Sequence, residues 1–208
     1  MEIYAQQTVW AAAMLAHKLN DGYFTRGRAY VERMNGKNTR TNVSLIMGAL
    51  KEKSEFAQEL ILQGQKTREY LSKVYTAKCL YSTLNDFEKQ DVDAINCEKF
   101  DDVLTISSVA RLISKAEELK ALEGCLTKVP EECIGTVKSR NQFEISIVSS
   151  AYSTRYDSFI IKGIVNDKVP VMFFYKKSLP TDTTVSVKAT VKRYTQDTVQ
   201  FNRVTILN

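Results

Sequence analysis

The chain has one histidine, one tryptophan and three prolines in 208 residues, and its four cysteines show no C-x-x-C spacing. Without that spacing neither a zinc site nor a disulfide framework is indicated, and the cysteines are expected to be small packed hydrophobes. The longest apolar run, Val9 to Ala16, is far shorter than the roughly 20 residues that a membrane-spanning helix needs. Glu2 stands where a secretory leader would carry lysine or arginine. These absences predict a cytoplasmic protein without membrane contact.

The single histidine and the absence of phosphate-binding motifs count against most enzyme mechanisms. Nucleophilic triads need a base, and the single histidine, His17, lies on an apolar helical stripe. The sequence has no Walker loop and no G-x-G-x-x-G segment to cradle a phosphate. The acidic pairs Asp91 with Asp93 and Asp101 with Asp102 are candidate metal ligands, but acidic loops of this kind are usually solvated. We therefore predict that the protein is not an enzyme and uses no cofactor or metal.

Proline and charge are distributed unevenly along the chain. All three prolines lie in the last 79 residues, so the first 129 residues contain none. A proline-free stretch suits helices, because proline in a helix interior costs about 3 kcal/mol. Residues 1–84 carry a net charge of +5, residues 85–130 of −4, and residues 131–208 of +4. Two basic segments around an acidic one hint at a polyanionic partner.

Helical periodicity runs through residues 1–129. Trp10, Ala13, Met14 and His17 repeat at i, i+3, i+4 and i+7, which is one face of an amphipathic helix. Turn residues should end this helix near Asp21, and residues 85–105 should form short helices and loops. A second helix is expected with Thr25 as its N-cap and its end near Met34, and a third is expected to start at about Thr41. A long helical stretch should run from about Ser54 to Leu84 with a break near Gly64. The apolar stripe from Val109 to Leu119 predicts one more helix.

The last 79 residues change to a period of two. Val185, Val187, Ala189 and Val191 alternate with polar residues, as in a half-buried strand. Four more strands are expected at 142–151, 156–165, 169–176 and 198–207, with a hairpin turn at 166–167 and a bulge near 202–203. Five strands in about 70 residues fit a closed barrel better than a sandwich. The predicted fold class is α+β, with an all-α domain over 1–129 and a five-stranded β-barrel domain over 130–208.

The barrel segment resembles a known family on several short motifs. These are Ile134-Gly135-Thr136-Val137, the run from Val187 to Arg193, and Phe201-Asn202-Arg203-Val204. In this order they resemble the OB-fold domains of single-stranded-DNA-binding and replication-associated proteins of phages and bacteria, over about residues 133–207. Many OB-folds insert a helix between strands three and four, but residues 177–182 leave room only for a turn. The resemblance implies an OB-type barrel that binds single-stranded nucleic acid.

Binding a single strand requires cations along the phosphates and aromatic faces for the bases, each stacked base being worth roughly 1–3 kcal/mol. Strand parity places Lys162 and Phe174 on the outside of strands two and three, among apolar neighbours. Phe174 would then be a stacking platform between Lys162 and Lys176. The predicted nucleic-acid-binding residues are Tyr152, Arg155, Tyr156, Lys162, Phe174, Lys176, Lys177, Lys188, Lys192, Tyr194 and Arg203.

These features also have structural interpretations. The N-terminal helices or a second subunit could cover the apolar outer face of strands two and three. Lys188 and Lys192 could be solvated charges that discourage strand pairing. A further basic cluster is either a second phosphate-contacting surface or a solvated helix face. It comprises Arg26, Arg28, Arg33, Lys37 and Arg40.

The leading hypothesis is a protein that binds single-stranded nucleic acid, most simply DNA, as a phage-type accessory of replication or recombination. Its helical domain would form homo-oligomers or recruit a replication protein or a host protein. The alternative is a structural or protein-interaction protein, such as a virion component or an inhibitor of a host protein, that binds no nucleic acid. The two hypotheses differ in whether a single-stranded oligonucleotide binds in a salt-dependent way.

Overall fold

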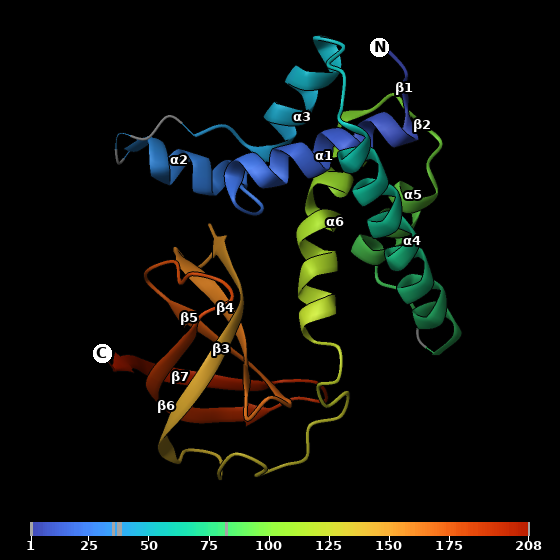
Figure 1. Ribbon diagram of the computed structural model, residues 1–208. Helices are drawn as coiled ribbons and strands as arrows, with labels where there is room; N and C mark the ends of the chain where they lie inside the picture. Colours follow the sequence, from blue (N-terminus) through green and yellow to red (C-terminus); the bar gives the residue numbers. More distant parts are fainter. Residues whose placement is uncertain (1, 35, 37–38, 82, 208) are drawn as a thin grey trace. The chain divides into compact units, whose positions relative to one another are not determined.

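The computed structural model describes residues 2–34, 36, 39–81 and 83–207. The chain forms two compact units, Met1–Glu117 and Glu118–Asn208. Helices make up most of the first unit, and a closed barrel of five strands makes up most of the second (Figure 1). The predicted α+β class, with helices first and a five-stranded barrel last, is confirmed. The predicted domain boundary at 129–130 lies in the segment that joins the last helix to the barrel.

The helices follow the predicted order. They are α1 (Gln6–Asn20), α2 (Arg26–Met34), α3 (Asn42–Lys51), α4 (Gln58–Tyr81), α5 (Asp86–Asn96) and α6 (Val103–Ala121). The hydroxyl of Thr25 accepts a hydrogen bond from the Arg28 amide at 3.2 Å, and that of Thr41 accepts one from the Ser44 amide at 3.1 Å. Each hydroxyl satisfies an amide that has no partner within its own helix, so both predicted helix starts are confirmed.

Helix α1 packs against α3 and α4, and alanines make up most of its buried residues. Its residues Trp10, Ala13 and Ala16 are fully buried. A Cβ placed on Gly64 of α4 would lie 3.1 Å from the carbonyl carbon and from the Cβ of Trp10, so glycine allows the two helices to approach closely. The predicted break near Gly64 is wrong, because α4 runs without interruption from Gln58 to Tyr81. The glycine serves helix packing rather than helix termination.

Residues 85–105 are more regular than predicted. Helix α5 starts at a capping box in which Asn85 and Glu88 bond to each other's backbone amides. Asp91, offered above as a metal ligand, is buried and accepts hydrogen bonds from Tyr75 Oη and Arg111 Nη2, both at 2.5 Å. Burial raises the pKa of Asp91, and these two donors oppose the rise. Asp91 therefore connects α4, α5 and α6 through these hydrogen bonds. Among the described residues, no group of three or more His, Cys, Asp or Glu side chains is arranged so that it could hold a metal ion.

Two short strands, β1 (Tyr4–Ala5) and β2 (Lys99–Phe100), form an antiparallel pair in the first unit. The periodicity did not predict this pair, because each strand has only two residues. The pairing places Tyr4 opposite Phe100, and the amide of Gln6 continues it by donating to the Glu98 carbonyl at 3.0 Å. The start of α1 is thereby held beside the segment that leads into α6.

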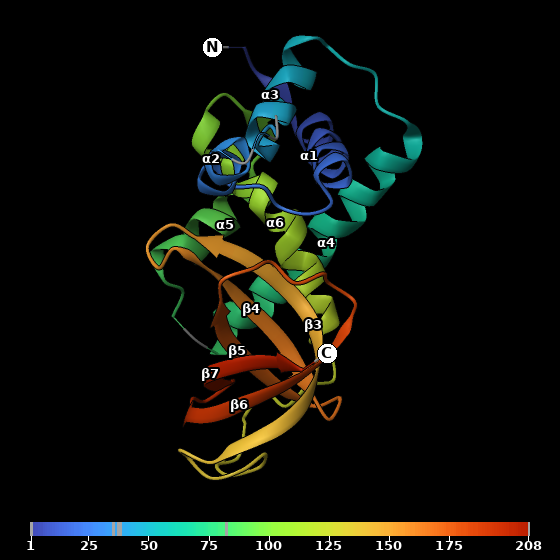
Figure 2. The same ribbon diagram turned by 90° about the vertical axis from the view of Figure 1, so that its left-hand side faces the viewer.

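The second unit is the barrel. Its strands are β3 (Arg140–Ser153), β4 (Ser158–Val165), β5 (Val169–Tyr175), β6 (Thr184–Tyr194) and β7 (Val199–Leu207). They close in the order β3-β4-β5-β7-β6, with β5 and β7 parallel and the other pairs antiparallel (Figure 2). This arrangement is compatible with an OB-like fold. No helix lies between β5 and β6, as the short segment between those strands predicted.

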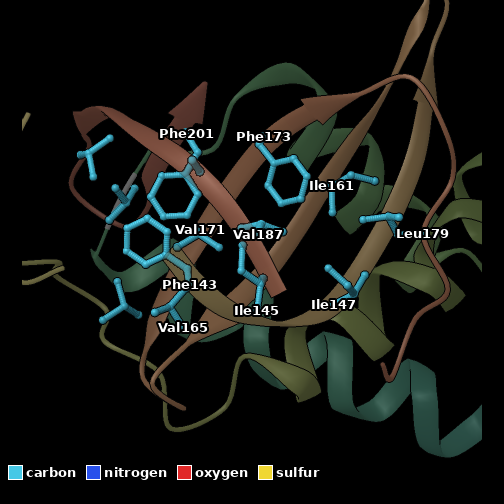
Figure 3. Close-up of a cluster of buried hydrophobic side chains, with 14 of the residues drawn as sticks. Phe143, Ile145, Ile147, Ile161, Val165, Val171, Phe173, Leu179, Val187 and Phe201 are labelled. Atoms are coloured by element: carbon cyan, nitrogen blue, oxygen red, sulfur yellow. The ribbon is translucent and has the colours of Figure 1, made fainter. Parts of the chain in front are cut away.

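Apolar side chains from all five strands point into the barrel (Figure 3). Phe143 and Phe201 stack at a centroid distance of 4.7 Å, and Phe173 is fully buried beside them in the same core. Val187 and Val191 are likewise fully buried, which confirms the predicted inward face of the fourth barrel strand. Apolar burial of this kind is worth about 25 cal/mol per Å² and holds the barrel closed.

Irregularities in the ladders bend the strands. Lys188 of β6 pairs with Thr205 of β7, and Thr190 pairs with Asn202. The step of two residues in β6 therefore faces a step of three in β7, so β7 carries one extra residue. Arg203, within this step, has a positive φ of 51°. The predicted bulge near 202–203 is therefore confirmed.

Gly163 of β4 lies where β3 approaches β4 closely. A Cβ there would lie 2.4 Å from Ile145 Cγ2 and 2.7 Å from the Ser146 carbonyl oxygen of β3.

All four cysteines are free, but Cys79 and Cys133 are exposed, so the expectation of packed cysteines is wrong for these two. Spacing alone could not show this, because exposure depends on what packs around each thiol. Among the helices of the described ranges, none has the length and apolar character needed to cross a membrane.

Candidate nucleic-acid interface

The outer side of β4 and β5 carries aromatic, apolar and basic side chains. The ladder pairs Ile160 with Phe174 and Lys162 with Met172, so these four side chains are neighbours on one face. The residues between them on each strand point into the core, as parity predicted. We call this surface, together with the adjacent turn between β3 and β4, the aromatic face. It consists of Arg155, Tyr156, Ile160, Lys162, Met172 and Phe174.

Two exposed rings meet on the aromatic face. Phe174 is 37% exposed and Tyr156 is 54% exposed, and their ring centroids are 4.9 Å apart in an edge-to-face arrangement. The guanidinium carbon of Arg155 lies 5.4 Å from the centroid of the Tyr156 ring. Exposed rings add little to a core, whereas their π-faces can stack on bases and a neighbouring arginine can contact phosphate.

The turn that presents Tyr156 is held by its neighbours. Tyr152 packs edge to face on Phe159 at 5.3 Å, and its hydroxyl donates a hydrogen bond to Asp157. This hydrogen bond raises the pKa of the Tyr152 phenol, so the phenol stays a neutral donor. The amide of Tyr156 donates to the Ser153 carbonyl at 3.3 Å and closes the turn. Tyr152 lies in β3, one residue beyond the predicted end of this strand at 151, and it supports the turn from there.

The cations of this region differ in their surroundings. Lys162 Nζ donates to Glu118 Oε1 at 2.6 Å, and both residues belong to the second unit. Glu118 is only 13% exposed, so its carboxylate neutralises part of the positive charge that we assigned to Lys162. Lys176 and Lys177 follow directly after β5 and are exposed. The exposed cations near the two rings are therefore Arg155, Lys176 and Lys177.

Three other predicted binding residues lie on strands β6 and β7. Lys188 belongs to a hydrogen-bonded surface on the outside of β3, β6 and β7, which we call the polar face. The polar face consists of Arg140, Gln142, Glu144, Ser146, Thr184, Ser186, Lys188 and Thr205. Its side chains bond across strands, with Gln142 Nε2 donating to Ser186 Oγ at 3.0 Å and Arg140 Nη1 to the Arg203 carbonyl at 2.8 Å. Lys192 and Arg203 are exposed at the two register shifts between β6 and β7.

Tyr194 has a structural partner within the barrel. Its hydroxyl donates to the Gly135 carbonyl at 2.6 Å and accepts from the Ile134 amide at 3.4 Å. Burial raises the pKa of the Tyr194 phenol, which keeps this donor neutral. The ring packs against the barrel core. The Ile134-Gly135 motif and Tyr194 thus anchor the segment that enters β3, and a direct role of Tyr194 in binding stays a prediction.

The structure therefore divides the predicted site. The aromatic face and its immediate surroundings bring together Tyr152, Arg155, Tyr156, Lys162, Phe174, Lys176 and Lys177. Lys188, Lys192, Tyr194 and Arg203 lie on β6 and β7. Sequence reasoning missed Asp157 and Glu118. Asp157 could have been noticed as an acid beside the predicted turn, but no sequence pattern relates Glu118 to a lysine 44 residues away.

The basic cluster of the first unit is centred on α2. Arg26 and Arg33 are exposed, whereas the Arg28 guanidinium lies 4.1 Å from the centroid of the Phe24 ring. Partial burial lowers the pKa of Arg28. Arg28 is thus partly used in packing. Lys37, which the prediction also included, lies outside the described residues.

Comparison with known proteins adds no relative. No protein-family model matches the chain, and searches of curated proteins and of solved structures find no match. Function must therefore be inferred from the chain's own residues.

Proposed function

We propose that this protein binds single-stranded nucleic acid, most simply DNA, on the aromatic face of its barrel. The observation that carries the proposal is the exposed edge-to-face pair of Tyr156 and Phe174 with Arg155 beside it. A barrel compatible with an OB-like fold supports it, since such barrels bind oligonucleotides on the face of their second and third strands. Those strands are β4 and β5 here.

The proposed chemistry divides between rings and cations. Bases stack on Phe174 and Tyr156, and because every base has a π-face, this contact has little sequence preference. The exposed charges of Arg155, Lys176 and Lys177 follow the phosphates. No step of this binding requires catalysis or a cofactor. We propose the protein as an accessory of replication or recombination, with the helical unit as the part that meets a replication protein, a host protein or further copies.

A second candidate function rests on the same surface. Ile160 and Met172 flank the rings, and Lys162 is paired with Glu118, so part of the face is apolar and less basic than its lysines suggest. Such a surface also fits a protein partner that supplies apolar and aromatic side chains. The protein would then be a structural or interaction protein, for example a virion component or an inhibitor of a host protein.

A direct titration separates the two candidates. Fluorescence anisotropy of a labelled single-stranded oligonucleotide of about 16 nucleotides, the upper end of the site size of one OB barrel, measures binding. We expect binding at about 50 mM salt that weakens steeply at about 200 mM salt, because phosphate contacts release counterions. A duplex of the same sequence is the control and should bind more weakly. Absence of binding at the lower salt concentration would contradict the proposal and favour a protein partner.

A further inference from the structure

The segment around α2 carries positive charge with little acid to balance it. Residues 22–50 contain five lysines and arginines and one acidic residue, Glu32, so their net charge is +4. Arg26, Arg33 and Arg40 are exposed, and no carboxylate of the described residues forms an ion pair with any of them. This local excess of positive charge is complementary to a polyanion.

The exposed side of α2 carries cations and an aromatic ring together. Arg26, Tyr30, Arg33 and Met34 lie at i, i+4, i+7 and i+8, which is one face of a helix. We call these four residues the α2 face. Tyr30 is 63% exposed and Met34 is 72% exposed. A merely solvated helix face usually alternates charges of both signs, whereas this face combines like charges with large apolar side chains.

Helix α2 is held in place chiefly at its start. Of its nine residues, all of which the structure describes, Ala29 alone is fully buried, so the helix adds little to the core. The segment before it is fixed by the fully buried Asn42 at the start of α3. Asn42 Oδ1 accepts from the Phe24 amide at 2.8 Å, and its Nδ2 donates to the Gly22 carbonyl at 3.0 Å. The α2 face is thereby presented from a fixed base.

The arrangement of the α2 face distinguishes between two kinds of anionic partner. A helix that lies on an anionic membrane keeps its apolar side chains on one face and its cations on the other. On α2, Tyr30 and Met34 share their face with Arg26 and Arg33. A single strand of nucleic acid presents phosphates and flat bases side by side, so it suits a face on which arginines adjoin a ring.

We propose that the α2 face is a second contact surface for single-stranded nucleic acid, separate from the aromatic face of the barrel. Arg26 and Arg33 bind phosphate oxygens through their guanidinium groups, and Tyr30 stacks on a base. This inference rests on the proposed function, because the ligand is the same. The two surfaces belong to different compact units, so variants of each can be tested separately.

The salt dependence of binding tests the two arginines. The full chain is titrated by anisotropy with a single-stranded oligonucleotide of about 40 nucleotides, longer than the site of one OB barrel. Arg26→Gln/Arg33→Gln should reduce the slope of log K against log salt by about 1.4, because each neutralised phosphate of a single strand adds about 0.7. A slope equal to that of the wild type in this variant, shown to be folded by circular dichroism and thermal melting, would overturn the proposal.

A matched pair of lysines is the control for this measurement. Lys66→Gln/Lys73→Gln removes the same charge from α4, a helix of the same unit, at the same sequence spacing. Both lysines are exposed. This variant should keep the slope of the wild type. An equal reduction of the slope in the α2 and α4 pairs would overturn the proposal, because it would reflect net charge rather than a surface.

Tyr30 tests the stacking contact. Tyr30→Ala should weaken binding at low salt at least about fivefold, the lower end of what one stacked base contributes. Tyr30→Phe retains the ring and should bind within about twofold of the wild type. Equal affinity of the wild type and a folded Tyr30→Ala variant would overturn the assigned contact and the proposal with it.

Two further comparisons separate this inference from the proposed function and from membrane binding. If the α2 variants weaken binding and Tyr156→Ala/Phe174→Ala does not, the α2 face stands and the barrel interface fails; the reverse pattern overturns the α2 face alone. Sedimentation with vesicles of phosphatidylserine and phosphatidylcholine tests the membrane. Vesicle binding that Arg26→Gln/Arg33→Gln abolishes, with oligonucleotide binding unchanged, would overturn the proposal in favour of a lipid surface.

Discussion

The two outer faces of the barrel are built on the same strand alternation but carry different chemistry. On the polar face, Gln142 of β3 donates a hydrogen bond to Ser186 of β6. The hydroxyls of Ser146 and Thr184 form another hydrogen bond between these strands, with Oγ and Oγ1 3.3 Å apart. On the aromatic face, Phe174 and Tyr156 instead present two exposed rings whose centroids are 4.9 Å apart. The polar face offers no ring on which a base could stack, which is why we place the proposed single-strand binding on the aromatic face.

The comparison also shows that positive charge alone is a poor guide to a site. Lys188 and Lys162 are both lysines on outer faces of the barrel, yet Lys188 lies in a row of hydrogen-bonded polar side chains and Lys162 is paired with Glu118. Neither is distinguished by its sequence neighbours. The exposed ring pair distinguishes the aromatic face, because contiguous exposed apolar surface is typical of binding sites, whereas hydrogen-bonded polar side chains are ordinary surface.

The largest effect is expected from removing the two rings. The double variant Tyr156→Ala/Phe174→Ala should weaken binding of single-stranded DNA by at least about 30-fold, since each stacked base contributes roughly 1–3 kcal/mol and every 1.4 kcal/mol is a factor of ten. Anisotropy titration at low salt measures the change. The control is Gln142→Ala/Ser186→Ala on the polar face, which should leave affinity nearly unchanged. If both double variants bind alike, the distinction between the faces has no functional meaning.

A second effect concerns the strand pairing beneath the aromatic face. Gly163→Ala forces a Cβ to within 2.4 Å of Ile145 and should lower the free energy of unfolding by about 1–3 kcal/mol. Urea denaturation followed by circular dichroism measures this change. Gly48→Ala is the matched control, because a Cβ there meets no atom within 4 Å, and in helix α3 alanine should stabilise by about 0.5–1 kcal/mol. Equal stability of Gly163→Ala and the wild type would contradict the close approach of β3 and β4.

A smaller effect is expected on the salt dependence of binding, which compares the lysines after β5 with those on β6. Lys176→Gln/Lys177→Gln should reduce the slope of log K against log salt by about 1.4, because each cation that neutralises a phosphate of a single strand adds about 0.7 to that slope. Lys188→Gln/Lys192→Gln removes the same charge from β6 and should change the slope less. The measurement is anisotropy at several salt concentrations. A larger change for the β6 pair would move the phosphate path to that part of the barrel.

The smallest effect is expected from releasing Lys162. Glu118→Gln removes the carboxylate that lies 2.6 Å from Lys162 Nζ and should strengthen single-strand binding about two- to fivefold, the range of a partly exposed ion pair. The affinity should return to the wild-type level when Lys162→Gln is added. Unchanged or weaker binding of a folded Glu118→Gln variant would place Lys162 outside the interface.

Much of the fold could be predicted because the signals are local. The period of two in β6 and the parity shift in β7 come from neighbouring residues, and both agree with the structure. The caps at Thr25 and Thr41 are equally local. The candidate site was predicted less completely. Parity placed Phe174 outside, but its edge-to-face contact with Tyr156 depends on the turn that Asp157 and Tyr152 hold.

The sequence by itself determined the α+β class, the order of helices and strands, and which side chains of β4, β5 and β6 point inward. These follow from periodicity, because burial of one face forces apolar residues to repeat with the period of the element. Only the tertiary structure decided that Tyr4 lies opposite Phe100, that Gly64 lets α4 pass Trp10, and that Glu118 neutralises Lys162. Such contacts join residues far apart in the chain, and their energy depends on distances and burial that exist only after folding.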